Sequence, residues 1–159
     1  MSEALSKSAA SVQAVLEKKG IKSKVIEMPA STRTAQEAAD AIGCEVAQSV
    51  KSVVFRVEGT EEPLLILASG VNRVNEKQIK RYLGEKIEKA DADFTRRVTG
   101  FAIGGIPPIG HLQAIRTLID QDLLQHEVCW AAAGTPHAVF SLKSSDLVVL
   151  TDGEVIDIS

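Results

Sequence analysis

The stretch Val50-Lys51-Ser52-Val53-Val54-Phe55-Arg56-Val57 is rich in β-branched and aromatic residues, a composition typical of a β-strand. A polar segment with turn-forming glycine and proline follows it, and residues 64–69 are again almost entirely apolar. Two such runs joined by a turn predict a β-hairpin, with strands over residues 52–57 and 64–69. Lys51 stands at the start of the hairpin, where its amine either reaches into a cleft or remains in solvent.

Helical patterns and short strand-like segments flank this hairpin on both sides. Thr34, Asn75 and Asp91 stand where they can cap three of the helices, and Ser144 or Ser145 can cap the last one. Helices mixed with hairpins, rather than strict strand–helix–strand alternation, predict an α+β fold with a mixed, mostly antiparallel sheet and surrounding helices. The expected helices cover residues 8–20, 34–43, 75–84, 91–97 and 144–150, with a helical turn near residue 122, and the expected strands outside the hairpin cover residues 24–28, 86–89, 117–120, 127–131, 137–142 and 154–158.

The whole chain of 159 residues has the length and composition of one ordinary globular domain. No internal repeat or low-complexity linker divides it, so we expect a single domain over residues 1–159. The formal net charge of −3 argues against bulk binding of a polyanion, because non-specific phosphate binding needs many cations. This charge still permits recognition of one end of a nucleic acid.

The two cysteines, Cys44 and Cys129, form no CxxC motif and no apolar leader opens the chain, so we expect reduced thiols and a cytoplasmic location. No apolar run is long enough to span a bilayer, and we expect no membrane role. The HExxH, GxSxG, GxxxxGK[ST] and strand-linked GxGxxG signatures do not occur. We therefore expect no metal ion and no cofactor, and we interpret Cys129 as a buried apolar residue rather than a nucleophile.

The segment Gly100-Phe101-Ala102-Ile103-Gly104-Gly105-Ile106-Pro107-Pro108-Ile109-Gly110-His111, here called the glycine–proline loop, contains four glycines and two prolines. It can continue neither as a helix nor as an interior strand. It is either a rigid pocket wall that offers main-chain polar groups to a small ligand or a structural bulge and turn. A second loop of small residues, Ala131-Ala132-Ala133-Gly134-Thr135-Pro136, also adjoins predicted strands. Together with Lys51, these loops favour a pocket built largely from backbone.

Four segments in this order resemble the YbaK/prolyl-tRNA synthetase-associated domain family: Val50-Lys51-Ser52, Thr99-Gly100-Phe101 running into the glycine–proline loop, Gly134-Thr135-Pro136, and Ser145-Asp146-Leu147. The likeness extends from about residue 12 to residue 158. This family includes free-standing aminoacyl-tRNA deacylases and the editing insertion of bacterial prolyl-tRNA synthetase. The resemblance implies a barrel-like sheet and a hydrolase that removes a wrongly attached amino acid from tRNA.

The resemblance also implies roles for individual residues. Lys51 would hold the phosphate or ribose of the terminal adenosine, and Gly104 and Gly105 would line the aminoacyl pocket, where loop amides can stabilise an oxyanion. The segment Ser31-Thr32-Arg33-Thr34 is either a rim of this pocket or only the loop that leads into the Thr34 cap. The substrate-binding candidates named on this basis are Thr32, Arg33, Thr34, Ser52, Ile106, Pro107, Pro108, Gly110, His111, Gly134, Thr135, Pro136 and His137.

Alternatives stay open at several positions. His111 either touches the adenosine or merely ends its loop, and His137 either faces the aminoacyl group or is satisfied by backbone. Cysteinyl-tRNA deacylases of this family have Ser-Gly-Gly where this chain has Ala132-Ala133-Gly134. This difference argues against cysteine, and we expect the substrate to be alanine or a similarly small residue on tRNA(Pro). The expected partners are the acceptor end of aminoacyl-tRNA and, for further contacts, prolyl-tRNA synthetase, with no DNA. The alternative function is a non-catalytic module that binds a nucleotide or a tRNA acceptor end.

Overall fold

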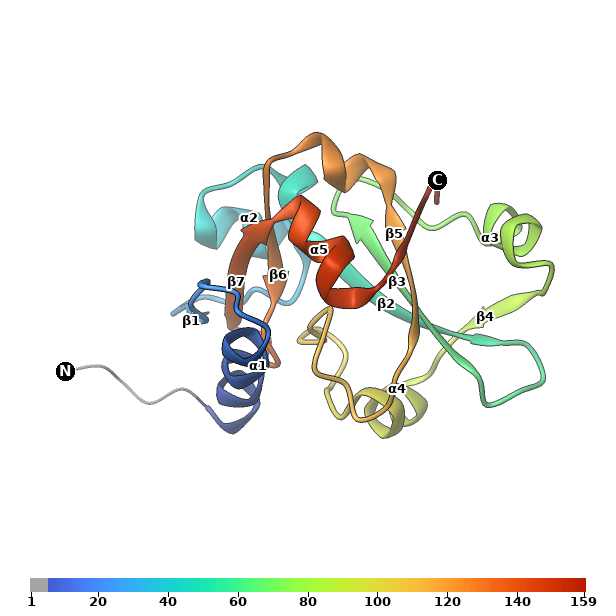
Figure 1. The fold of residues 1–159 in the computed structure, drawn as a ribbon, viewed down its shortest axis with the longest axis horizontal. Coiled ribbons are helices and arrows are strands. Elements are labelled where there is room, and N and C mark those ends of the chain that lie inside the picture. The colour runs from blue at the N-terminus through green and yellow to red at the C-terminus, as the bar shows by residue number, and fades with distance from the viewer. Residues whose placement is uncertain (1–5) are drawn as a thin grey trace.

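The computed structural model describes residues 6–159, which form two β-sheets with helices packed around them (Figure 1). The elements in chain order are α1 (Lys7–Lys18), β1 (Ile26–Glu27), α2 (Ala35–Ile42), the 3-10 helix η1 (Val46–Gln48), β2 (Val50–Val57), β3 (Pro63–Ser69), α3 (Glu76–Leu83), β4 (Ile87–Lys89), α4 (Ala92–Thr99), β5 (Arg116–Asp120), the 3-10 helix η2 (Gln121–Gln125), β6 (Val128–Ala132), β7 (Ala138–Lys143), α5 (Ser144–Thr151) and β8 (Glu154–Ile156).

The predicted hairpin forms the centre of the larger sheet. β2 and β3 pair antiparallel, from Val50 opposite Ser69 to Arg56 opposite Pro63. β4 adds antiparallel to β2, whereas β5 lies parallel to β3 and β8 lies parallel to β5. The strand order is therefore β4-β2-β3-β5-β8. The hairpin and the mixed sheet of an α+β fold are confirmed.

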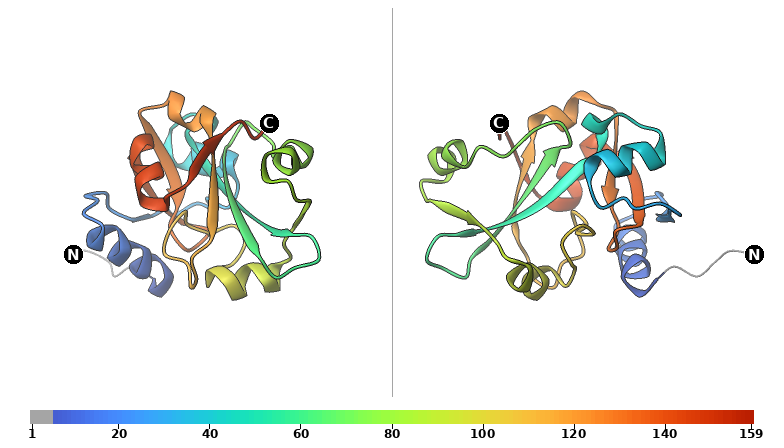
Figure 2. Two further views of the ribbon diagram at one scale, coloured as in Figure 1. Left: turned by 45° about the vertical axis from the view of Figure 1, so that its right-hand side comes forward. Right: turned by 180° about the vertical axis from the view of Figure 1, so that it is seen from behind.

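The expected barrel-like closure is wrong. The smaller sheet has the order β1-β7-β6, and an isolated parallel bridge between Ser49 and Trp130 joins it to the larger sheet. Figure 2 shows from two further directions that the sheets remain distinct. Within residues 6–159 no ring of strands closes. The edge strand β6 meets the larger sheet only through that single bridge, and the other outer strands, β1, β4 and β8, span only two or three residues.

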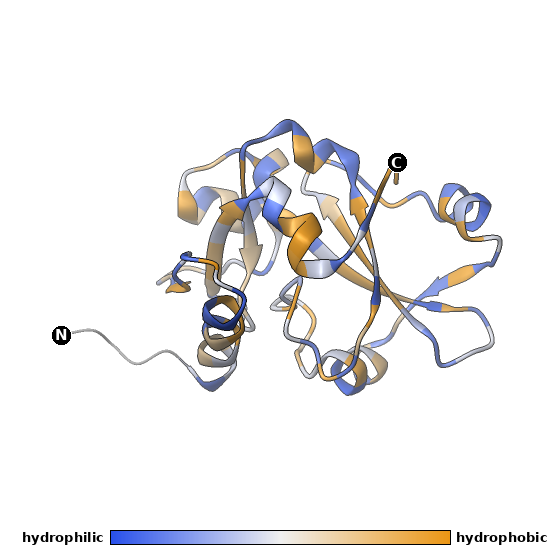
Figure 3. Cartoon of the chain, viewed as in Figure 1, coloured by the Kyte–Doolittle hydropathy of each residue, from blue (hydrophilic) through white to orange (hydrophobic). Residues whose placement is uncertain are grey.

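β3 is buried on both faces, which explains its unbroken apolar sequence. Leu65 and Leu67 belong to a cluster with residues of α1, α4 and α5, whereas Leu64 and Ile66 belong to a second cluster with Ile79 of α3. Figure 3 shows the hydrophobic residues gathered on the strands of the larger sheet and a mostly hydrophilic α3. None of the helices in the described part of the chain is long and apolar enough to cross a membrane.

The helix caps mostly follow the local signals. Side chains of Thr34, Asn75 and Asp91 accept backbone N–H groups in the first turns of α2, α3 and α4, as predicted. The cap predicted for the last helix is wrong, because neither serine caps it. α5 begins at Ser144 itself, and the Ser144 hydroxyl donates to the carbonyl of His126, which draws it away from the helix end.

Two predicted strands are shorter than expected because other groups take their backbone hydrogen bonds. The strand predicted over residues 24–28 contains only Ile26–Glu27, and the N–H of Val25 donates to Oε1 of Gln13 at 2.7 Å. The strand predicted over residues 154–158 ends at Ile156, and the carbonyl of Ile158 accepts the N–H of Asn75 at 2.7 Å.

Candidate functional site

A pocket of about 310 Å³ opens where the first half of β2, helix α2, strand β6 and the glycine–proline loop meet. We call it the Lys51 pocket. Its wall is mainly aliphatic, and among the charged residues it includes two cations and no carboxylate. The lining residues are Thr32, Arg33, Thr34, Ala35, Ala38, Ile42, Ser49, Val50, Lys51, Ser52, Val53, Ile103, Gly104, Ile106, Trp130, Ala131, Ala132 and Val139.

The pocket exists because β2 has a free edge there. β3 pairs with β2 along its whole length, but on the other side β4 pairs only with Phe55 to Val57, and the N–H of Ala90 reaches the carbonyl of Val54. Backbone groups of alternate strand residues point to the same side, so those of Ser52 face this same edge. Within residues 6–159 no strand pairs with β2 at Ser52 on this side, so the edge there lacks a hydrogen-bonding partner strand.

The first half of the glycine–proline loop forms one wall, and close packing requires glycine at two of its positions, Gly104 and Gly105. A Cβ at Gly105 would lie 2.8 Å from the Cα of Thr135, and the N–H of Gly134 donates to the carbonyl of Gly105 at 2.8 Å. Gly104 has φ +98°, and a Cβ there would lie 2.7 Å from Cγ of Arg33. The two small-residue loops therefore pack directly against each other, and Gly104 contributes bare backbone to the pocket.

Lys51 lines the same pocket as Gly104, so the structure brings these two candidate residues together. Gly105 is buried against Thr135 and is not part of the lining. The side chain is half-buried, and its Nζ donates to the backbone carbonyl of Asn72 in the turn after β3. Burial is the largest of the effects that lower the pKa of Lys51. The charges of Arg73 and Lys89 lower it further, whereas the carboxylate of Asp120 opposes them.

Two side-chain hydroxyls in this wall have no hydrogen-bond partner among the described residues. They are Oγ1 of Thr32 and Oγ of Ser52, and both atoms are buried. An unpartnered buried hydroxyl costs about 1–3 kcal/mol, so proteins seldom leave one unless a bound molecule completes it. Thr32 and Ser52 therefore carry two buried hydroxyls beside the pocket for which the described residues supply no partner.

The rim residues Arg33 and Thr34 also line the pocket, as does Ile106. Thr34 has a second function, because its Oγ1 accepts the N–H of Glu37 at 3.1 Å and caps α2. The rim and the cap, which the sequence left as alternatives, thus occur at the same residue. Pro107 is buried next to Ile106 but is not part of the lining.

Pro108, Gly110 and His111 lie elsewhere. They line a second cavity of about 680 Å³, bordered by α1, α5 and the second half of the glycine–proline loop, which shares no lining residue with the Lys51 pocket. We call it the His111 cavity. His111 Nε2 lies 2.7 Å from the carbonyl oxygen of Pro107, and burial lowers the pKa of the imidazole. The structure thus divides the residues of one sequence motif between two cavities.

The loop that contains Gly134 to His137 stands behind the pocket wall. The carbonyl of Pro136 accepts the N–H of Thr32 at 2.6 Å, and Nδ1 of the exposed His137 lies 3.2 Å from the carbonyl oxygen of Ala30. Thr135 touches Gly105 through its backbone. Gly134, Thr135, Pro136 and His137 do not line the Lys51 pocket but hold its rim and its glycine wall, and a direct contact of these residues with substrate stays a prediction.

Sequence reasoning missed much of the apolar lining. Ala35 and Ala38 of α2 and Trp130 of β6 face the pocket, and only the spacing of small residues on the predicted second helix indicated a closely packed face.

Cys129 is fully buried, and burial raises the pKa of its thiol to about 11, which confirms its interpretation as an apolar residue. No group of three or more His, Cys, Asp or Glu side chains in residues 6–159 is arranged to hold a metal ion.

The sequence pattern of the family described as "Aminoacyl-tRNA editing domain" matches residues 29–150, which include the whole Lys51 pocket. The chain belongs to this family. The resemblance inferred from the motifs around Lys51 and the glycine–proline loop is thereby confirmed. Membership implies that aminoacyl-tRNA is the substrate of the domain.

Individual relatives agree with this assignment. A solved structure described as that of a candidate trans-editing enzyme for prolyl tRNA synthetase superposes with a TM-score of 0.92 at 45% identity, over 98% of this chain and 99% of that one. The uncharacterized protein YwhH of Bacillus subtilis (strain 168) is 28% identical over 123 residues, 77% of this chain and 78% of YwhH. A proline–tRNA ligase of Limosilactobacillus fermentum is 37% identical over 94 residues, which are 57% of this chain but only 16% of that much longer enzyme.

Proposed function

We propose that this protein is a trans-editing deacylase that hydrolyses the ester between a small, wrongly attached amino acid and the terminal adenosine of a tRNA. The observation that carries the proposal is the presence of Lys51 and Gly104 in one pocket of an aminoacyl-tRNA editing domain. We further propose that residues 1–159 act as a single editing domain, since the match to the candidate trans-editing enzyme covers 98% of the chain.

The pocket supports a mechanism based on placement and electrostatics. Lys51 is a cation suited to a phosphate or ribose oxygen of the terminal adenosine. The open backbone of Gly104 and the free edge of β2 at Ser52 can place the ester and an attacking water, and amide donors can stabilise the oxyanion that forms. An aminoacyl ester is already reactive, so orienting its carbonyl against water suffices and no protein nucleophile is required.

The small side chains in the pocket wall are compatible with a small amino acid. Ala35, Ala38 and Ala131 contribute only methyl groups to a pocket of about 310 Å³ that includes the indole of Trp130 on its wall. A synthetase distinguishes one methylene by only about 1–3 kcal/mol, so a second site that removes small mischarged residues raises fidelity. We propose alanine on tRNA(Pro) as the first substrate to test, because relatives of this chain include proline–tRNA ligases.

The proposal is tested by deacylation assays on tRNA(Pro) carrying alanine, cysteine, serine or proline, with wild-type protein and the Lys51→Ala variant. We expect the wild type to release one small amino acid and to spare proline, and Lys51→Ala to lose at least about a hundredfold in kcat/KM. If the wild type releases no amino acid but binds an acceptor-stem RNA, and Lys51→Ala weakens that binding, the protein is a non-catalytic acceptor-end module instead.

A further inference from the structure

A buried carboxylate lies next to the Lys51 pocket without lining it. Asp120, the last residue of β5, is 1% exposed. Its Oδ2 accepts the N–H of Ser69 at 2.9 Å and Nδ2 of Asn72 at 2.8 Å, and its Oδ1 accepts the N–H of Asp122 at 2.9 Å. A carboxylate is rarely this deeply buried unless charges or hydrogen bonds compensate for the lost water.

Asn72 connects this carboxylate to Lys51. Its side-chain Nδ2 donates to Asp120 and also to Oδ2 of Asp122 at 2.7 Å, while its backbone carbonyl accepts the ammonium of Lys51. The N–H of Asn72 in turn donates to the carbonyl of Ser69 at 2.9 Å. Both ends of the turn after β3 are thus tied to β5, and the carbonyl that holds Lys51 belongs to that turn.

The same turn packs against a wall of the pocket. A Cβ at Gly70 would overlap the carbonyl oxygen of Val46 and would lie 2.9 Å from Cβ of Ala35, which itself lines the Lys51 pocket. The turn therefore has little freedom to shift. The carbonyl of Asn72 occupies a defined place, and it uses one of the three ammonium donors of Lys51, leaving two for a ligand.

The protonated amine of Lys51 also needs a nearby negative charge, because most of its surroundings disfavour the positive charge. Arg73 and Lys89 both disfavour the ammonium, and burial disfavours it more strongly, whereas Asp120 is the charged group that opposes them. Asp120 thus has two effects on Lys51, because it holds the turn that binds the ammonium and its charge favours the protonated state.

We propose that Asp120 and Asn72 are positioning residues that hold the ammonium of Lys51 at the pocket, ready for an oxygen of the terminal adenosine. This inference rests on the proposed function, since it gives Lys51 its role there. Neither residue touches the substrate. Asp120 acts on Lys51 through the Asn72 turn and through its charge.

The decisive measurement follows the side-chain amine of Lys51 directly, by NMR titration of protein labelled on lysine. In Asp120→Asn we expect the pKa of Lys51 to fall below its wild-type value, because the favourable charge is gone and the unfavourable ones remain. The matched control is Asp93→Asn, which removes the same charge from the exposed first turn of α4 and should leave the titration unchanged. An unaltered Lys51 titration in folded Asp120→Asn overturns the proposal, and this readout requires no substrate.

A kinetic cycle tests the same coupling in the reaction. We expect Asn72→Ala, which keeps the carbonyl but removes its side-chain anchors, to lower kcat/KM by about tenfold in the wild-type background and to have little further effect in Lys51→Ala. Equal losses in both backgrounds would show a merely structural role and overturn the proposal.

Asn72→Ala leaves Asp120 bonded to Ser69 and Asp122, so this variant replaces Asp120→Asn in the test if Asp120→Asn does not fold. If the wild-type protein has no deacylase activity, the proposed function is contradicted. The NMR titration still shows whether Asp120 acts on Lys51.

Discussion

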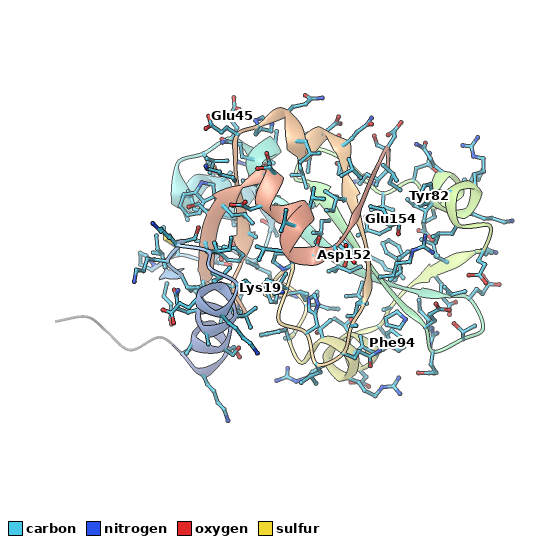
Figure 4. All side chains as sticks on the ribbon, viewed as in Figure 1. Lys19, Glu45, Tyr82, Phe94, Asp152 and Glu154 are labelled. Carbon is cyan, nitrogen blue, oxygen red and sulfur yellow. The ribbon has the colours of Figure 1, made fainter. Side chains whose placement is uncertain are left out.

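The Lys51 pocket and the His111 cavity differ in their chemistry more than in their size. The His111 cavity is the larger, about 680 Å³ against about 310 Å³. Its hydroxyl groups are already satisfied, because Thr117 Oγ1 donates to the carbonyl of Ile115 and Thr151 Oγ1 donates to that of Leu147. Lys19, at the end of α1 on its border, is exposed (Figure 4).

In the Lys51 pocket, by contrast, the lysine is partly buried and the hydroxyls are not satisfied. Its cation is half-buried and held by the protein, and the hydroxyls of Thr32 and Ser52 have no partner among the described residues. Buried polar groups that the fold leaves without a partner indicate a binding site better than volume does, because a ligand or an ordered water that pairs with them recovers their desolvation cost. Matched substitutions in the two cavities test this difference.

Among these matched substitutions, the largest difference should come from the two halves of the glycine–proline loop. In Gly105→Ala the new Cβ meets the backbone of Thr135 at 2.8 Å, so the pocket wall must move. We expect kcat/KM for deacylation to fall by at least about tenfold and the free energy of unfolding to fall by about 1–3 kcal/mol. Deacylation kinetics and urea unfolding measure the two quantities.

Gly110→Ala is the matched control for Gly105→Ala. Gly110 borders the His111 cavity with φ +83°, and a Cβ there meets only Cγ2 of Val15, at 3.5 Å. We expect a cost of about 1–2 kcal/mol from the left-handed backbone and unchanged kinetics. Equal losses of activity in the two alanine variants would mean that the whole loop, and not its first half, belongs to the site.

A smaller effect on stability and activity should distinguish the unpartnered hydroxyl of Ser52 from the hydrogen-bonded hydroxyl of Thr117. Ser52→Ala removes a buried hydroxyl without a partner, so we expect an unchanged or slightly higher free energy of unfolding. Deacylation should slow by roughly threefold to tenfold, the value of about one hydrogen bond to substrate or water. Thermal unfolding and single-turnover deacylation on the same preparation separate the two quantities.

Thr117→Val should behave in the opposite way. It breaks the 3.0 Å hydrogen bond to Ile115 beside the His111 cavity, so we expect a loss of about 1 kcal/mol in stability without a change in activity. A Ser52→Ala variant that loses stability but not activity would show that its hydroxyl has a structural partner and no ligand.

The smallest effect concerns His111 and pH. Burial lowers the pKa of His111 from 6.5, so below about pH 6.5 the unfolded chain binds this proton more readily than the folded protein does. Stability should therefore decline as the pH falls through this range, and His111→Leu should show a smaller decline in urea midpoints. Deacylation at neutral pH should be unchanged, and a clear loss of activity in His111→Leu would assign His111 to the substrate after all.

Much of the fold was predictable because its signals are local. The apolar strands on either side of the turn at Gly59 specify the hairpin, and Thr34, Asn75 and Asp91 specify helix ends through hydrogen bonds within one turn. The family resemblance also rests on short motifs that do not require coordinates. Predictions failed where distant groups compete, as at Val25, whose N–H is taken by the side chain of Gln13.

The site was only half predictable for the same reason. Lys51 and Gly104 could be paired from motif order, but the division of the glycine–proline loop between two cavities depends on how α1, α2 and α5 pack around it. No spacing in the sequence connects Lys51 to Asp120, which lies 69 residues further along the chain by residue number. Their connection depends on the parallel pairing of β3 with β5, a contact between distant segments.

The sequence by itself determined which segments are strands and helices, which family the chain belongs to, and which residue types are available for the chemistry. Those properties depend on backbone preferences and hydrogen bonds within a few residues of each other. Only the tertiary structure decided that β4 stops short of Ser52, that Thr32 and Ser52 keep unpartnered hydroxyls, and that a buried carboxylate supports Lys51. These depend on which distant segments meet, and the packing of the whole core sets that outcome.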